Sequence, residues 1–330
     1  METRETGGQP AAGGGLHVVF GAGALGRGIA RKLKARGRKV RIVSRSGGGG
    51  EAGIEAYKAD ASDVRATPKA CEGAAVVYHT ATPDYTKWAE LYPAIQRGVI
   101  EGAAAAGARL ISAESVYMYG PAGQAKGPMT EDLPHSAPTR KGRIRAELAR
   151  MAMEAHEKGR VRVALGRAPD FYGPEADATT IYGGRVFYPA LKGKKVQVMG
   201  KLDNPHTFIY LPDFAAGLVV LGEHEEALGQ AWHVPSAPTL TQRQLLELVF
   251  KAAGHKPSVG EAPGLVFKGL GLFVPIMREL AEMLYQWEQP YLVSHAKFER
   301  AFGKDAVAVT PHEEAVKQTV DWFRAHPAKA

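Results

Sequence analysis

The sequence has almost no cysteine and no long apolar run, and each absence excludes a class of protein. Cys71 is the only cysteine in 330 residues, so no internal disulfide can form and no cysteine-based zinc site can be built. The most apolar late segment, residues 265–277, is interrupted by a lysine, two glycines and a proline. It is shorter than the ~20 residues that a membrane span needs. We therefore expect a protein of a reducing, cytoplasmic compartment without a membrane partner.

Histidines and basic residues are plentiful, but their spacing favours neither a metal nor a nucleic acid. The eleven histidines show no clustered or i, i+4 spacing, so we expect no metal site. A net charge of +8 suggests nucleic acid as a partner, yet the basic clusters at 27–41 and 140–145 lack interleaved aromatic residues. We expect no nucleic-acid partner and interpret the charge as steering for an anionic cofactor and a small-molecule substrate.

The stretch 16–45 has the pattern strand, glycine turn, helix, strand. Residues 16–20 are an apolar run, a helical pattern extends from 24 to about 36, and a second apolar run occupies 40–43. The intervening G-x-G-x-x-G predicts dinucleotide binding in this context. A glycine-rich turn without a ligand is the alternative, and the spacing of the flanking elements argues against it.

The three glycines of this turn have separate physical roles. Gly21 permits the tight turn, Gly23 lets the backbone approach a pyrophosphate, and Gly26 lets the helix pack close to the strand. The unpaired N–H groups at the start of the helix, at Ala24 and Leu25, then face the anion.

Strands and helices alternate along the first half of the chain. Further apolar strands are expected at 54–59, 75–80, 109–112 and 161–168, with helices between them. This order predicts an α/β fold with a doubly wound, parallel Rossmann sheet. Ligands of such sheets bind beyond the carboxyl ends of the strands.

Composition changes after residue 169, where proline and glycine become frequent. We expect a disordered tail at 1–15 and a Rossmann domain at 16–169, to which 207–235 returns, with 207–211 as a strand of the main sheet. Residues 170–206 and 236–330 then form a smaller substrate-binding cap with helices at 240–253, 277–286 and 312–323.

Five further motifs occur in a familiar order. They are YKAD at 57–60, VVYHTAT at 76–82, RAPDFYGP at 167–174, TFIYLPD at 207–213 and the segment 310–323. With the glycine turn, they resemble the extended short-chain dehydrogenase/reductases, the NAD-dependent epimerase/dehydratase group, over nearly the whole chain. The resemblance implies a nicotinamide cofactor and a possible homodimer.

The resemblance also assigns residues to the cofactor and the substrate. The cofactor residues that it implies beyond the glycine turn are Asp60, Ala61, Thr80, Ala81, Thr82, Pro169 and Phe171. The substrate residues that it implies are Asp170, Tyr172 and His206, the last at a position where the family often has an arginine.

The end of the second strand predicts which nicotinamide cofactor binds. An NAD site places an Asp or Glu about twenty residues after the glycines, whereas this strand ends in Ser44 and Arg45. A guanidinium and a hydroxyl would bind a 2′-phosphate through charge-assisted hydrogen bonds, so we expect NADP(H).

The catalytic pattern of the family is incomplete. It needs a Ser or Thr that binds the substrate oxygen, and a Tyr-x-x-x-Lys pair on one helix face. Alignment on Tyr119 assigns the serine role to Ser115, whereas alignment on Tyr117 assigns that position to Ala113. Counting back from Glu147 puts Thr139 in the tyrosine position and Arg143 in the lysine position, where Arg143 would still bind the ribose. The string from Tyr188 to Lys192 lies outside the expected helix and is interpreted as coincidence.

Three functions are consistent with this pattern. The favoured one is an atypical NADPH-dependent reductase of an aldehyde or ketone, with Tyr117, Tyr119, Lys141 or a water held by Ser115 as the displaced proton donor. The alternatives are a non-catalytic NADP(H)-binding sensor or scaffold and a sugar-nucleotide epimerase or dehydratase.

Overall fold

The computed structural model describes residues 15–125, 127–262 and 274–328. The tail expected at 1–15 lies outside this part, except for Gly15, as do residues 265–273 of the apolar segment. No helix in the described ranges is long and apolar enough to cross a membrane.

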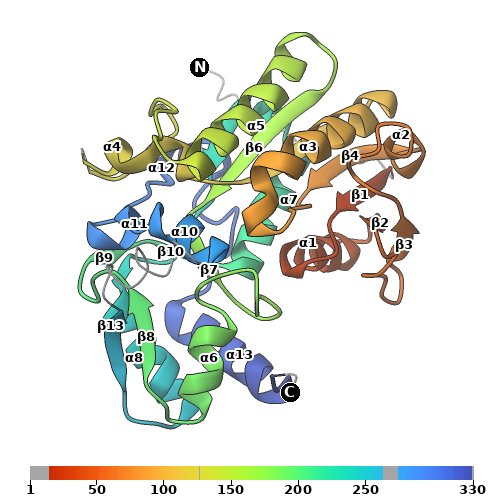
Figure 1. Cartoon of the computed structure of the whole chain (residues 1–330). Coiled ribbons are helices and arrows are strands. Elements are labelled where there is room, and N and C mark those ends of the chain that lie inside the picture. Colours follow the sequence, from red (N-terminus) through yellow and green to blue (C-terminus); the bar gives the residue numbers. More distant parts are fainter. Residues whose placement is uncertain (1–14, 126, 263–273, 329–330) are drawn as a thin grey trace, which may run out of the picture.

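A seven-stranded parallel sheet forms the centre of the molecule (Figure 1). Its spatial order is β11-β6-β5-β4-β1-β2-β3, and every neighbouring pair is parallel. The strands are β1 Leu16–Phe20, β2 Lys39–Ser44, β3 Glu55–Lys58, β4 Ala74–His79, β5 Arg109–Ser115, β6 Arg162–Ala168 and β11 Gln230–His233. The predicted doubly wound Rossmann fold is confirmed.

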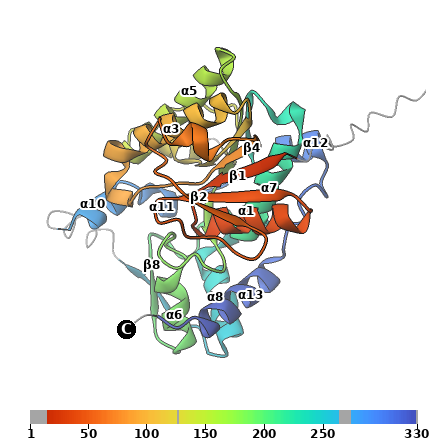
Figure 2. The ribbon, with the colours of Figure 1, turned by 90° about the vertical axis from the view of Figure 1, so that its right-hand side faces the viewer.

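Helices cover both faces of the sheet (Figure 2). On one face α1 (Ala24–Ala35) packs against α7 (Leu211–Glu223), and on the other α3 (Trp88–Ala105) packs against α5 (Arg140–Glu157) and the short α2 (Thr67–Ala70). Side chains of a strand alternate between the faces, so each strand of the centre contributes to two cores. Both faces of the sheet are buried under helices, which agrees with the nearly continuous apolar runs of the strands.

A smaller cap lies at the carboxyl side of the sheet (Figure 1). It has its own core, in which the rings of Phe187 and Phe323 stack with centroids 4.8 Å apart. The elements of this cap are α6 Gly184–Leu191, β8 Val196–Met199, α8 Gln242–Ala253, β13 Val259–Ala262 and α13 His312–Ala325.

Two short sheets connect the cap to the Rossmann domain. β7 (Asp170–Tyr172) pairs with β10 (Phe208–Tyr210), and β9 (Pro205–His206) pairs with β12 (Leu240–Thr241). The prediction that 207–211 returns to the main sheet is therefore wrong, and β11 joins that sheet instead. Pro169 separates β6 from β7 and has no N–H to continue the ladder.

Short helices occupy the remaining connections. They are η1 Tyr85–Lys87, η2 Tyr117–Tyr119, α4 Gly120–Gln124, η3 Glu225–Ala227, α10 Pro275–Ala281, α11 Tyr285–Glu288 and α12 Ala296–Phe302. The single helix expected at 277–286 is thus two short ones. The helix expected after the third strand is reduced to the four residues of α2, because most of the segment between β3 and α2 forms turns.

Candidate active site

The glycine turn follows β1 at the carboxyl edge of the sheet. Gly21 has φ +108°, and a Cβ there would lie 2.7 Å from Thr80 Oγ1. A Cβ on Gly26 would collide with the carbonyl oxygen of Gly21. By contrast, a Cβ on Gly23 meets nothing within 4 Å. The first and third glycines are thus required by the protein's own packing, while the second faces open space.

The start of α1 offers free hydrogen-bond donors beside that space. Its N-cap, Gly23, provides no side chain, and the first turn contains no acidic residue. The first backbone hydrogen bond of the helix runs from Arg27 N to Gly23 O, at 3.0 Å. The N–H groups of Ala24, Leu25 and Gly26 precede it and remain available, which fits the pyrophosphate of a dinucleotide.

The end of β4 is fastened directly to the glycine turn. Thr80 donates through both its backbone N (2.9 Å) and its Oγ1 (2.8 Å) to Phe20 O. Ala81 and Thr82 follow at the same edge, and Thr82 Oγ1 donates to Thr80 O at 3.3 Å. The structure therefore brings this predicted segment and the turn together.

The end of β2 carries the residues expected at the adenosine ribose. Ser44 Oγ donates to Gly48 O at 3.0 Å, and Arg45 is exposed. Asp60 accepts hydrogen bonds from Ser62 N (2.8 Å) and Ser62 Oγ (2.7 Å), which lower the pKa of its carboxyl together with the nearby charge of Arg45. Asp60 and Ala61 thus lie on a loop next to the β2 edge, as the resemblance implies.

The Tyr119 hydroxyl lies in a buried polar network. Its hydroxyl accepts a hydrogen bond from Arg167 Nη1 at 2.7 Å and lies 2.8 Å from His233 Nε2. Arg167 Nε in turn donates to Glu114 Oε2 at 2.9 Å, with both side chains buried. Burial raises the pKa of Tyr119 to about 12. The geometry argues against Tyr119 as a proton donor.

Tyr117 begins η2, two residues after the end of β5. Ser115 is the last residue of that strand, and both side chains are half-buried. The Tyr117 ring stacks on Trp88, with centroids 6.4 Å apart. Burial raises the pKa of Tyr117 well above its ordinary value, and the nearby Tyr85 and Asp170 act in the same direction. The phenol therefore stays protonated at neutral pH.

The helix that should carry Tyr-x-x-x-Lys presents a different pair from the one predicted. Thr139 is the N-cap of α5 and accepts from Gly142 N at 3.1 Å. Arg143 is exposed and donates to the carbonyl of Pro138. The buried face instead carries Lys141 and Arg145, four residues apart. Arg143 therefore lies on the exposed face of α5, and the pair on its buried face is Lys141 and Arg145.

Lys141 and Arg145 are held by different neighbours. Lys141 Nζ lies 2.9 Å from Glu279 Oε2 of α10, and it also donates to the carbonyl of Tyr85. Burial lowers the pKa of Lys141, while Glu279 opposes the shift. The Arg145 guanidinium lies 4.5 Å from the ring centroid of Trp88. The apolar period of Ile144, Leu148 and Ala152 on the same face is the sequence signal that indicates this register.

The predicted substrate residues separate into two groups. Asp170 Oδ2 lies 2.9 Å from His206 Nε2, and both side chains are buried at the junction of sheet and cap. Tyr172 instead lies 2.9 Å from His312 Nδ1 inside the cap core. Phe171, between them in sequence, packs half-buried against the α1–α7 face, directly after Pro169. Asp170 and His206 thus form a buried pair between β7 and β9, and Tyr172 packs in the core of the cap.

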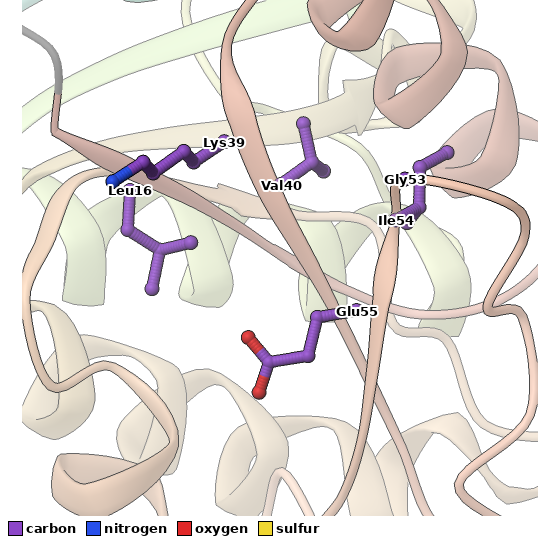
Figure 3. A pocket seen from close by; sticks show the side chains of 6 residues that line it. All are labelled: Leu16, Lys39, Val40, Gly53, Ile54 and Glu55. Carbon is purple, nitrogen blue, oxygen red and sulfur yellow. The ribbon is translucent and has the colours of Figure 1, made fainter.

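Two hollows occur in the described part of the chain. One, of about 470 Å³, lies beside the starts of β1 and β2 and is lined by Leu16, Lys39 and Glu55 among others (Figure 3). The other, of about 350 Å³, lies between α5, β6 and β11. In the described residues no group of three or more potential metal ligands occurs.

Comparison with known proteins agrees with the geometry of the glycine turn. The model of the NAD dependent epimerase/dehydratase family matches residues 17–234. The chain belongs to this family. This family is a group of extended short-chain dehydrogenase/reductases. The protein is therefore an NAD(P)-dependent enzyme with a nicotinamide dinucleotide cofactor. No curated protein matches the chain.

Solved structures reproduce the whole fold at low identity. An epimerase from Methanothermobacter thermautotrophicus has a TM-score of 0.78 at 18% identity, covering 96% of this chain and 94% of that one. UDP-N-acetylglucosamine 4-epimerase from Bacillus cereus has 0.76 at 14%, covering 96% and 98%. dTDP-glucose 4,6-dehydratase from Bacillus anthracis, determined with NAD, has 0.75 at 14%, covering 94% and 97%. At such identities the likeness establishes the fold alone.

Proposed function

We propose that this protein is an NADP(H)-dependent oxidoreductase that reduces a carbonyl substrate held between the Rossmann sheet and the cap. The observation that carries the proposal is the placement of Tyr117 two residues after Ser115, at the carboxyl end of β5. The glycine turn supports dinucleotide binding, and Ser44 with Arg45 at the end of β2 supports the 2′-phosphate.

Reduction of a carbonyl adds a hydride at carbon and a proton at oxygen. The bound reduced nicotinamide supplies the hydride. The chain has to orient the carbonyl, polarise its oxygen and supply the proton. Tyr117 can donate its phenolic proton to that oxygen as charge develops, and Ser115 supplies a second hydroxyl at the same strand end. Asp170 and His206 form a buried pair where the cap meets the Rossmann domain.

The same residues are poorly suited to oxidation of an alcohol. That direction needs a base at neutral pH, and burial keeps the Tyr117 phenol protonated. Lys141, at the start of α5, is paired with Glu279, and α5 carries no tyrosine whose pKa this lysine could lower. The direction of reduction is thus the one that the described side chains support.

A second candidate, a sugar-nucleotide epimerase or dehydratase, is favoured by the comparisons. The family model and the named substrates of two similar structures belong to that class, and they do not support carbonyl reduction specifically. Its chemistry begins with hydride removal from an alcohol, for which the tyrosine is missing from α5.

One assay set separates the candidates. NADPH oxidation is followed with a panel of aldehydes and ketones, and UDP- and dTDP-sugars are tested in parallel for epimerisation and for loss of water. Turnover of a carbonyl with NADPH, abolished in Tyr117→Phe, is the expected result. Turnover of sugar nucleotides alone would replace the proposal by the second candidate. Tight NADPH binding without any turnover would indicate the non-catalytic alternative.

The domain and assembly predictions belong to the same proposal. Residues 16–169 with 207–235 would hold the cofactor, and 170–206 with 236–330 would hold the substrate. A homodimer is proposed from the family resemblance, and sedimentation velocity tests it.

A further inference from the structure

A charged network borders the glycine turn on its outer side. Arg27 and Arg31 lie one turn apart on α1 and both bind Glu175, which follows β7. Arg31 also pairs with Glu51 on the loop after β2, with Nε 3.0 Å from both carboxylate oxygens. One helix thus joins the glycine turn to loops from β2 and β7.

Arg27 is the member of this network nearest to the turn itself. Its Nη1 donates to the carbonyl of Ala22, within G-x-G-x-x-G, at 2.5 Å. Its Nε lies 2.5 Å from Glu175 Oε2. The guanidinium is therefore anchored at the mouth of the turn, beside the free N–H groups of α1 and the open space over Gly23.

Glu175 has an unusual backbone for its residue type. Its φ is +66°, and it is the one non-glycine residue with positive φ among those that the structure describes. Such a conformation costs about 1 kcal/mol or more and persists only where other contacts hold it. Here the two arginines hold the carboxylate, whose side chain is 14% exposed.

We propose that Arg27 binds the pyrophosphate of the dinucleotide and that Glu175 occupies this anion site until the dinucleotide enters. The inference rests on the proposed dinucleotide binding and adds a residue outside the glycine motif. A carboxylate on a guanidinium beside a helix N-terminus is the intramolecular equivalent of a phosphate oxygen there. The incoming pyrophosphate displaces the Glu175 carboxylate, which is also negative, from Arg27. Glu175 therefore lowers the affinity of the protein for the dinucleotide by competition.

Binding measurements on four proteins test this inference. The dissociation constants of NADPH, NADH and inorganic pyrophosphate are measured for the wild type, Glu175→Gln, Arg27→Gln and the control Glu51→Gln. Glu51 contacts Arg31 but not Arg27. We expect Glu175→Gln to bind all three anions about threefold or more tighter, Arg27→Gln about tenfold or more weaker, and the control to match the wild type.

Several results would overturn the inference. Unchanged or weaker binding in Glu175→Gln would show that Glu175 does not compete for the site. A loss in Arg27→Gln confined to NADPH would assign Arg27 to the 2′-phosphate instead of the pyrophosphate. If Arg27→Gln does not fold, Arg27→Lys is the substitute; it keeps the charge but loses the bidentate guanidinium, so weaker binding of all three anions is again expected and unchanged binding would argue against a direct contact. A wild type that binds neither dinucleotide would instead refute the proposed function itself.

Discussion

The Nζ of Lys141 lies 2.9 Å from the Oε2 of Glu279, and both side chains are almost completely buried. This ion pair joins the start of α5 to α10, at the place where the family carries its tyrosine. Glu282 on the same segment accepts from the backbone N–H groups of Arg140 (2.9 Å) and Lys141 (3.1 Å). The N-terminus of α5 is thus capped by the Glu282 carboxylate from a distant segment in addition to Thr139.

Breaking this pair from one side should destabilise the protein. Lys141→Met leaves Glu279 buried without its main partner, and the free energy of unfolding is expected to fall by about 3–5 kcal/mol. The double variant Lys141→Met, Glu279→Leu should recover most of that loss, since neither charge remains. Urea denaturation of the wild type, both single variants and the double variant measures this, and equal losses in single and double variants would argue against a coupled pair.

Removal of one phenolic oxygen tests the proposed proton donor. Tyr117→Phe keeps the ring that stacks on Trp88, so the fold should be unchanged, while kcat for carbonyl reduction falls by about 10²-fold or more. Tyr119→Phe is the matched control, because the Tyr119 hydroxyl lies in the network of Arg167 and His233. A larger loss of kcat in the control than in Tyr117→Phe would contradict the assignment.

Arg45 should determine the preference between the two dinucleotides. Arg45→Asp replaces a cation by a carboxylate that repels a 2′-phosphate and can bind a 2′-hydroxyl. NADPH binding is expected to weaken far more than NADH binding, as measured by fluorescence titration of both cofactors. Equal losses for the two cofactors would remove the basis for choosing NADP(H).

Buried histidines predict acid sensitivity. Burial and Arg145 lower the pKa of His79 to about 3, and neither ring nitrogen has a hydrogen-bond partner among the described residues. His79 therefore binds a proton near pH 6.5 in the unfolded chain but stays neutral at that pH in the folded chain. His79 costs stability progressively as pH falls from about 6.5 toward 3, by at most about 1.4 kcal/mol per pH unit.

Replacement of His79 isolates its share of this effect. His79→Leu should have a shallower decline of the free energy of unfolding between pH 6.5 and 4.5 than the wild type. Urea denaturation at several pH values gives both slopes. Identical slopes would mean that the acid sensitivity arises elsewhere, for example at His233, whose pKa burial also lowers to about 3.

The fold could be predicted from the sequence because each buried strand has an apolar run between glycine or polar turns. β1, β2 and β4 appear within one residue of their predicted bounds. The assignment of 207–211 to the main sheet failed, because strand pairing depends on partners far away in the chain. Periodicity identifies a strand but not its neighbour.

The site could be predicted only where local sequence determines it. The glycine turn is such a case, since its backbone alone makes the binding surface. The buried pair Lys141 and Arg145 was not predicted, because the family spacing was counted from the exposed Glu147 instead of from the buried Ile144. The contacts of Lys141 with Glu279 and of Arg27 with Glu175 join residues more than a hundred positions apart, and no local pattern indicates them.

The central claim, that a nicotinamide dinucleotide binds over the glycine turn, is tested most directly by NADPH titration of the wild type and Gly23→Val. A side chain at Gly23 enters open space, but valine is a poorer N-cap of α1 than glycine, so the free energy of unfolding should fall by only about 1 kcal/mol. The same side chain fills the room that the pyrophosphate needs, so binding should weaken by about a hundredfold or more. Undiminished NADPH binding by Gly23→Val would contradict the account.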